Sequence, residues 1–137
     1  IDREQVCRID SPIMLSGRAD FVLHNDGKFF VVELKTINQR GWDNDLVNGP
    51  KVEHSTQLQC YLNMLNYDEG VILYENKNSQ QIKTFVINRN ADLWNGILSR
   101  GTAIARMVSP PRMAEVAAIH YSYCDCKLVT DEELGLG

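Results

Sequence analysis

Residues 13–37 read IMLSGRADFVLHNDGKFFVVELKTI. Two largely apolar runs, 13–24 and 28–37, flank the segment Asn25-Asp26-Gly27-Lys28. An Asp-Gly pair between two such runs is a strong signal for a tight turn that joins antiparallel strands. The sequence therefore predicts a β-hairpin here, and the rest of the fold is interpreted around it.

Two acids and a lysine lie at corresponding places in this predicted hairpin. Asp20 follows Ala19 in the first run, and Glu33 and Lys35 lie near the end of the second. Side chains two residues apart on a strand share a face, so Glu33 and Lys35 are expected to point together, with Asp20 on the neighbouring strand. Leu34 is expected to point the other way, into apolar packing. Two carboxylates suit Mg²⁺, and an ammonium group suits the negative charge of a phosphoryl transition state.

A simpler interpretation fits the same residues. An acid and a Glu-x-Lys triplet on adjacent strands can form an ordinary cross-strand charge pair on a solvated face. Charged residues are common enough that the spacing alone favours this interpretation. The choice between a site and a charge pair therefore depends on the segments that follow.

Residues 52–66 have the period of a helix. Its apolar face carries Leu58, Leu62 and Leu65, at i, i+4 and i+7. A polar stripe of His54, Gln57 and Tyr61 runs alongside and is expected to lie over the strand that carries Glu33 and Lys35. A half-buried amphipathic helix whose polar face has no function is the alternative.

Three short motifs follow one another along the chain. They are Gly17-Arg18-Ala19-Asp20, Glu33-Leu34-Lys35, and Gln57 with Tyr61 four residues later. Together they resemble the G-x-x-D, (D/E)-x-K and Q-x-x-x-Y elements of the PD-(D/E)XK nuclease superfamily, in its RecB-like exonuclease branch. Residues 74–78 are similar to a segment of phage-type members. The resemblance spans residues 13–90 and shifts the balance towards a functional site.

The resemblance implies a role for each matching residue. Asp20 and Glu33 would bind Mg²⁺ or Mn²⁺, with the Leu34 carbonyl as a further ligand. Lys35 would position or activate the attacking water, and Gln57 and Tyr61 would support the site and contact the substrate. The implied activity is hydrolysis of DNA phosphodiester bonds from single- or double-stranded ends. Such an exonuclease would act in DNA recombination, repair or phage replication.

Two departures from the family pattern stand out. Ala19 replaces the proline that gives the superfamily its name, a change that is common in the RecB-like branch. Relatives usually carry a further metal ligand, a His or Glu, in an upstream helix, and no helix is predicted before Gly17. Residues 1–137 are therefore expected to form one nuclease-like domain that lacks this helix.

Composition limits the other possibilities. The chain has 137 residues, 44% hydrophobic and 23% charged, as expected of a single globular domain. No apolar run is long enough to cross a bilayer, so no membrane partner and a cytoplasmic location are expected. The net charge of −4 makes tight duplex binding difficult, so phosphate contacts must come from a local basic strip. The candidate cations are Arg18, Arg40, Lys51, Lys77 and Lys83, of which Arg18, Lys51 and Lys77, with Tyr61, are the expected nucleic-acid contacts.

Four cysteines raise the question of an iron–sulfur cluster. They are Cys7, Cys60, Cys124 and Cys126. A cluster requires four converging thiolates, and Cys60 lies inside the predicted helix, which leaves three suitable ligands. Free thiols in a reducing compartment are the favoured interpretation.

The remaining segments complete an α/β fold with a restriction-endonuclease-like core. Residues 1–12 are expected to be an extended lead-in, and residues 38–51 a loop in which Trp42 either stacks on a base or covers the core. Residues 70–76 and 80–88 are expected to form a second strand pair. Residues 90–108 are expected to form a helix that covers the core and begins at Asn90 or Asp92. This gives a central mixed sheet of four or five strands flanked by α-helices.

The sequence leaves several functional alternatives open. A nuclease-derived module that binds nucleic acid or protein without cutting is the main rival, and a plain structural domain is the third. Exonuclease or endonuclease action, strand polarity, DNA or RNA as substrate, and oligomeric state are not determined by these residues.

Overall fold

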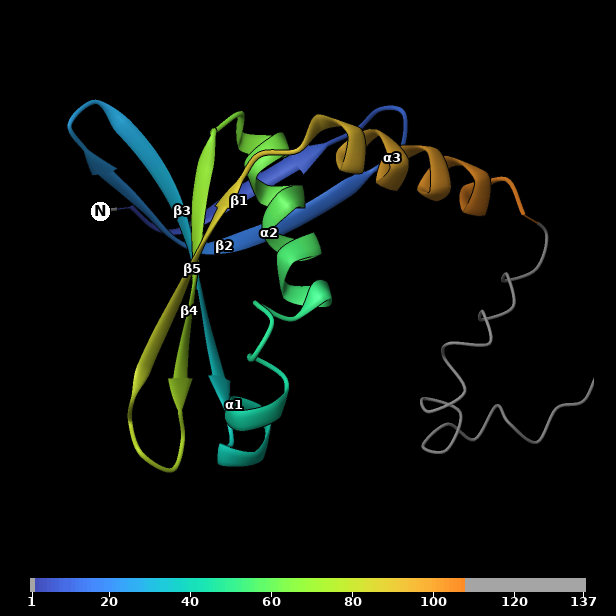
Figure 1. Ribbon diagram of the computed structural model, residues 1–137. Coiled ribbons are helices and arrows are strands. Elements are labelled where there is room, and N and C mark those ends of the chain that lie inside the picture. The colour runs from blue at the N-terminus through green and yellow to red at the C-terminus, as the bar shows by residue number, and fades with distance from the viewer. Residues whose placement is uncertain (1, 108–137) are drawn as a thin grey trace, which may run out of the picture. The chain divides into compact units, whose positions relative to one another are not determined.

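The protein is described here by a computed structural model in which residues 2–107 are placed. The described residues contain five strands and three helices, and Ile1–Ala105 forms one compact unit (Figure 1). The elements are β1 (Asp2–Ile9), β2 (Leu15–Asn25), β3 (Lys28–Ile37), α1 (Gln39–Asn44), α2 (Val52–Leu65), β4 (Glu69–Asn76), β5 (Ile82–Asn88) and α3 (Ala91–Ala105). The strands form a single mixed sheet in the order β1-β2-β3-β4-β5. The predicted fold class is therefore confirmed.

The predicted hairpin is present as β2 and β3. The turn residues Asp26 and Gly27 both have positive φ, 48° and 77°. A two-residue turn with positive φ at both positions matches the right-handed twist of the strands it joins. Beyond the turn, residues 21–25 pair with residues 28–32 in antiparallel register, from Asn25 opposite Lys28 to Phe21 opposite Val32.

Residues 2–9, expected to be an extended lead-in, are extended but also pair into the sheet as strand β1, which was not predicted. β1 pairs with β2 in antiparallel register, with Gln5 opposite Ala19 and Cys7 opposite Gly17. Cys7 is buried, whereas Val6 is 65% exposed. An edge strand with so few buried positions has little of the apolar alternation by which strands are recognised.

Strands β3 and β4 are parallel, and α2 is the crossover that connects them. Helix α2 confirms the helix predicted at residues 52–66. Its residues Leu58 and Leu62 are fully buried against the sheet, where Val31 of β3 and Ile72 of β4 are also fully buried. The core therefore lies between α2 and the centre of the sheet.

The segment 38–51, expected to be a loop, contains the short helix α1. The Asn38 side chain accepts a hydrogen bond from the Gly41 backbone N–H (2.8 Å) and caps this helix. Gly41 is buried, and a Cβ atom there would lie 2.7 Å from the Ile37 side chain. A glycine inside so short a helix weakens its sequence signal, which explains why the helix was not predicted.

The second strand pair is confirmed as β4 and β5, which are antiparallel.

Helix α3 is capped by Asn90, whose side chain accepts the Leu93 N–H (2.9 Å). Asn90 was one of the two cap residues predicted for this helix. No residue of α3 is buried, so the prediction of a core-covering helix was wrong. Helix α3 contacts α2, and its Gly101 approaches Ile13, but none of its side chains is among those that pack against the core. Val108, which was predicted to extend this face, lies outside the described residues.

The hairpin tip is attached to the end of α2 by stacked rings. The Phe29 ring stacks on His24 (4.7 Å between centroids) and on Tyr67 (5.1 Å), which packs against the core. The end of the sheet distant from α1 is thus held together by aromatic packing. None of the helices placed in residues 2–107 is long and apolar enough to span a membrane.

Candidate active site

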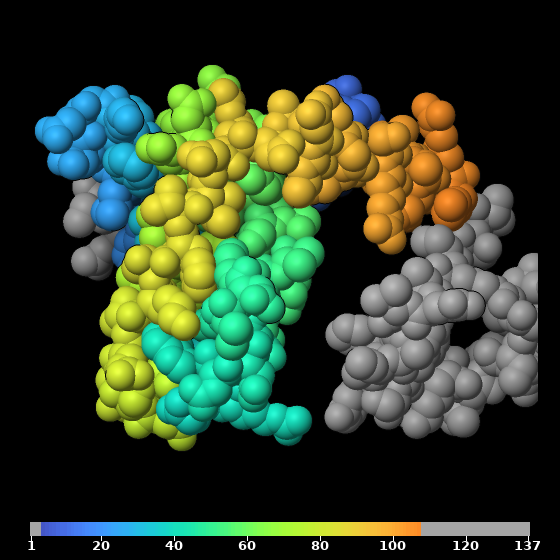
Figure 2. Space-filling model, viewed as in Figure 1, coloured from blue at the N-terminus to red at the C-terminus, as the bar shows by residue number. Residues whose placement is uncertain are grey.

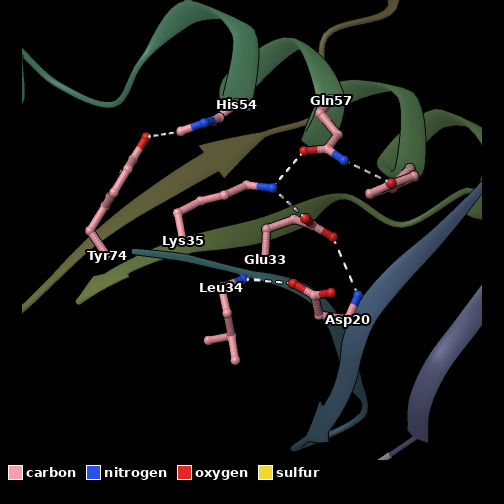
Figure 3. Close-up of polar contacts among 8 residues, drawn as sticks. Asp20, Glu33, Leu34, Lys35, His54, Gln57 and Tyr74 are labelled. Carbon is pink, nitrogen blue, oxygen red and sulfur yellow. Dashed lines mark hydrogen bonds and ion pairs between the residues drawn. The ribbon is translucent and has the colours of Figure 1, made fainter. Parts of the chain in front are cut away.

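The ladder between β2 and β3 stops where the two acids begin. The last backbone pair is Phe21 with Val32, and beyond it side chains replace the ladder. The Asp20 N–H donates to Glu33 Oε1 (3.3 Å), and the Leu34 N–H donates to Asp20 Oδ2 (2.9 Å). Each carboxylate is therefore bonded to the backbone of the other strand, as Figure 3 shows.

Glu33 is a buried carboxyl group. It is 2% exposed and faces α2 from the middle of β3. Burial raises the pKa of Glu33, the negative charge of Asp20 raises it further, and the hydrogen bond from Lys35 opposes both effects. Two acids at one place with a single lysine beside them are costly to keep ionised. A cation between them would offset that cost.

Lys35 is held between β3 and α2. Its Nζ donates to Glu33 Oε2 (3.2 Å) and to Gln57 Oε1 (2.7 Å). Gln57 in turn donates from Nε2 to the Tyr61 hydroxyl (3.0 Å). The predicted polar stripe of α2 thus lies over the predicted acid–lysine strand. Figure 3 shows Gln57, Lys35 and Glu33 joined in this order by hydrogen bonds.

Gly17 has a steric role in this arrangement. A Cβ atom at Gly17 would lie 2.5 Å from the Tyr61 ring. Tyr61 is 7% exposed and packs between α2 and β2, and burial raises the pKa of its phenol. The glycine at the start of the G-x-x-D element therefore makes room for the tyrosine that fixes Gln57. Its presence in the sequence motif has a packing reason.

His54 extends the polar stripe by one turn. Its Nδ1 lies 2.6 Å from the hydroxyl of Tyr74, and that hydroxyl also accepts the Lys51 N–H (3.1 Å). The Tyr74 hydroxyl thus connects His54 to the backbone at the start of α2. Burial lowers the pKa of His54, and the positive charge of Lys35 lowers it further. Tyr74 is fully buried and was not identified from the sequence, because its place beside α2 depends on the parallel register of β3 and β4.

Leu34 points away from α2, as predicted, but not into apolar packing. It is 45% exposed, so that part of the prediction was wrong. On its side of the sheet Leu34 lines a hollow of about 710 Å³ with Glu4, Asp20 and Phe21. No helix of the described part of the chain covers Leu34, and Asp20 can be reached from this hollow. Solvent thus has a route to Asp20 from this side, whereas Glu33 is buried and is not among the residues that line the hollow.

The two carboxylates fit a magnesium-type ion. Within residues 2–107, no group of three or more His, Cys, Asp or Glu side chains is arranged to hold a metal ion. Mg²⁺ does not need such a group, since it is commonly bound by one or two carboxylates together with waters and substrate phosphate oxygens. Asp20 and Glu33 supply oxygen donors of this kind, and zinc-type ligands are not gathered around them.

The predicted basic residues lie in three places. Lys51 and Lys77 line a common hollow with Arg40, at the end of β3. Arg18 lies apart on β2, where it is exposed and 3.6 Å from Glu4. Lys83 lies over the ring of Trp42, which packs against the core, so the core-covering interpretation of Trp42 is favoured over base stacking.

The cysteine question is only partly addressed. Cys7 is buried and Cys60 half-buried, and both are free thiols. Cys124 and Cys126 lie outside the described residues, as does the acidic tail from residue 112 onward. The described residues therefore do not test whether the four cysteines hold a cluster.

Comparison with known protein families decides the family. Residues 2–125 match the PD-(D/E)XK nuclease superfamily. The chain belongs to the PD-(D/E)XK nuclease superfamily. The three motifs recognised in the sequence thus lie within the matched part of the chain.

Two relatives accompany this assignment. The chain is 38% identical over 61 residues to the CRISPR-associated exonuclease Cas4 of Saccharolobus solfataricus, over 44% of this chain and 27% of that protein. The crystal structure of SSO0001 superposes with a TM-score of 0.64 at 24% identity, over 94% of this chain and 59% of that one. The chain thus spans little more than a quarter of the exonuclease and three-fifths of SSO0001. The structural likeness supports the restriction-endonuclease-like core of this PD-(D/E)XK chain.

Proposed function

We propose that this protein is a divalent-metal-dependent DNA nuclease that hydrolyses phosphodiester bonds. The observation that carries the proposal is the bonded chain of Asp20, Glu33, Lys35 and Gln57 at the point where β2 and β3 separate. A structural charge pair would not need two acids, one of them buried, next to one lysine. Membership of a nuclease superfamily supports the same chemistry.

Mg²⁺ or Mn²⁺ would be held by the carboxylates of Asp20 and Glu33, with the backbone carbonyl of Leu34 as a further ligand. When bound, such an ion polarises the phosphoryl group and lowers the pKa of bound water. The buried position of Glu33 favours this assignment, because a carboxylate removed from water gains most from a neighbouring cation.

Lys35 would orient the attacking water and stabilise charge on the phosphoryl oxygens. An ammonium group has three N–H donors, and Glu33 and Gln57 take two of them. The third is left for a water molecule or a phosphoryl oxygen. Gln57 keeps the lysine aimed, since its amide is fixed at both ends, by Lys35 and by Tyr61.

The expected DNA contacts divide into surface and buried groups. Arg18, Lys51 and Lys77 would bind the phosphate backbone, since all three carry charge at or near the surface. Tyr61 is 7% exposed, so we assign it to positioning Gln57 in place of the direct DNA contact that the motif implied. Exonuclease action is favoured over endonuclease action because the matched relative is named an exonuclease. The role would be in DNA recombination, repair or phage replication.

A non-cutting module that binds nucleic acid or protein is the second candidate. Two observations favour it: the described residues gather no group of three or more metal-binding side chains, and the net charge of the whole chain is −4. Such a module would bind DNA in EDTA and in Mg²⁺ equally, and would leave it intact.

End-labelled single- and double-stranded DNA incubated with the purified chain separates the two candidates. The nuclease requires degradation in Mg²⁺ or Mn²⁺, none in EDTA, and none with Lys35→Ala. Lys28→Ala is the matched control, since Lys28 lies in the turn of the β2–β3 hairpin, away from the site. Intact DNA in every condition, with binding retained, would establish the non-cutting module instead.

A further inference from the structure

A basic hollow adjoins the proposed active site at the far end of β3. Its volume is about 670 Å³, and it is lined by residues from the end of β3, from α1 and from the turn after β4. Three of the lining side chains are cations, Arg40, Lys51 and Lys77, and one is an acid, Asp45. Figures 1 and 2 show α1 beside the β4–β5 turn, where these segments meet.

Side-chain amides, one of them buried, hold the walls of this hollow in place. Asn76 is fully buried; its Nδ2 donates to Gln39 Oε1 (2.9 Å) and its Oδ1 accepts the Asn78 N–H (2.9 Å). The Asn78 side chain accepts the Gln39 N–H (2.8 Å), and the Lys77 N–H donates to the Ile37 carbonyl (2.8 Å). The start of α1 and the β4–β5 turn are therefore bonded to each other, so the backbones that carry Arg40 and Lys77 have fixed positions.

Of the three cations that line the hollow, one is paired with acids and two are not. Lys51 bonds to Asp45 (3.0 Å) and lies 4.0 Å from Glu53. Within residues 2–107, no salt bridge joins Arg40 or Lys77 to an acid. Two cations thus face the hollow without an acidic partner there, although the whole chain carries a net charge of −4.

The distance from the catalytic lysine fits a neighbouring phosphate. Ile37, to which Lys77 is bonded, lies two residues beyond Lys35, or about 7 Å at the rise of a strand. One strand of DNA carries a phosphate about every 3.4 Å of helix axis. A strand whose phosphate lies at Lys35 therefore has another phosphate, about two along, within reach of this hollow.

We propose that Arg40, Lys51 and Lys77 form a phosphate-binding site that holds the DNA strand next to the bond being cut. This inference rests on the proposed function for its ligand and extends it to the path of the substrate, from Asp20 along β3 towards α1. The ligand chemistry is a phosphate group, which belongs either to the strand terminus or to an internal phosphodiester.

Binding of labelled single-stranded oligonucleotides in EDTA tests the site without requiring cleavage. Full-length wild type is compared with the double variant Arg40→Gln, Lys77→Gln and with Lys28→Gln, an exposed lysine in the hairpin turn. The double variant should bind about ten-fold more weakly or worse, as expected when charge-assisted hydrogen bonds are lost. Its plot of log affinity against log salt should flatten by about 0.7 for each single-strand phosphate contact removed. Lys28→Gln should keep both the affinity and the slope.

The oligonucleotides carry a 5′-phosphate, a 3′-phosphate or hydroxyls at both ends. A loss confined to one phosphorylated substrate would assign the site to that terminus, and an equal loss on all three would assign it to an internal phosphate. Equal affinity and slope for the double variant and Lys28→Gln would overturn the inference. Cleavage is scored separately: DNA left intact in Mg²⁺ while binding depends on Arg40 and Lys77 would refute the nuclease and keep this site.

Discussion

The interface between β3 and α2 has an apolar half and a polar half. In the apolar half Val31 packs beneath Leu58 and Leu62, and all three are fully buried. In the polar half Glu33 and Lys35 lie beneath Gln57, joined by hydrogen bonds. The same strand and the same helix make both halves: Val31 and Glu33 are two residues apart on β3, and Gln57 and Leu58 are consecutive in α2.

The two halves contribute oppositely to stability. Each large apolar side chain buried in the first half contributes about 1.5–3 kcal/mol. The second half removes a carboxylate from water, which costs free energy that one lysine and one amide only partly repay. The comparison indicates that the apolar half holds the fold together, and that the polar half is retained for its chemistry.

Lys35→Met should have the largest effect, because it removes the charged group at the centre of the polar half. It keeps the length of the side chain and removes the charge, so it should lower the cleavage rate about 10²–10³-fold, the usual cost of losing one donor to a transition-state charge. In EDTA the free energy of unfolding should fall, because Glu33 is left buried beside Asp20 without a cation. In Mn²⁺ it should change much less, since the bound ion would take over that charge. Cleavage rates in Mn²⁺ and denaturant unfolding in both conditions measure these effects. An equally large loss of stability in Mn²⁺ and in EDTA would show that Lys35 has a structural role.

Leu58→Ala should give the reverse pattern. The change leaves a cavity beneath α2 and should reduce the free energy of unfolding by about 2–5 kcal/mol. The cleavage rate per folded molecule should fall far less than in Lys35→Met. Urea unfolding, with activity assayed well below the transition, checks both. Equal losses of activity in the two variants would mean that the halves are not separable.

Gln57→Ala tests the link between helix and site. Loss of an orienting partner typically costs about 10–100-fold in activity. The rate should fall within that range, because Lys35 keeps Glu33 but loses the bond to α2. Tyr61→Phe should have a smaller effect in the same direction, since Gln57 keeps its bond to Lys35. A Tyr61→Phe loss larger than that of Gln57→Ala would refute this order.

Substitution of His54 should give the smallest effect of these variants. It should change how the free energy of unfolding depends on pH. Its pKa is lowered in the folded protein, so the unfolded state binds a proton more readily. The stability that His54 contributes is therefore present above pH 6.5 and is lost as the pH falls through the lowered pKa. His54→Gln should flatten the fall in unfolding free energy over this range. An unchanged slope between wild type and His54→Gln would contradict the lowered pKa.

Local sequence signals predicted the parts of the site that depend on local structure. The Asp26-Gly27 turn brings Asp20 and Glu33 to adjacent strands, and helical spacing places Gln57 and Tyr61 on one face. The resemblance to a nuclease family then connected the two segments, and the family is confirmed.

Features that depend on contacts between distant segments were not predicted. Tyr74 meets His54 only because β4 lies parallel to β3. The basic hollow requires α1 and the β4–β5 turn to be bonded through Asn76. Helix α1 was itself not predicted, because the glycine within it weakens its helical sequence signal. Residues 2–9, within the expected lead-in, form strand β1 because they pair with β2 at the edge of the sheet. In each case a tertiary contact, and not local propensity, determines the structure.

Thermal unfolding of wild type and Glu33→Gln, each in EDTA and in Mn²⁺, tests the central claim that the polar half is a metal site. In EDTA, Glu33→Gln should unfold at the same temperature as wild type or higher, because a buried charge is gone. Mn²⁺ at 100 times its Kd should stabilise wild type by about 2.7 kcal/mol and should leave Glu33→Gln and Asp20→Asn unchanged. Equal stabilisation of all three proteins by Mn²⁺ would contradict the account, since the ion would then bind elsewhere.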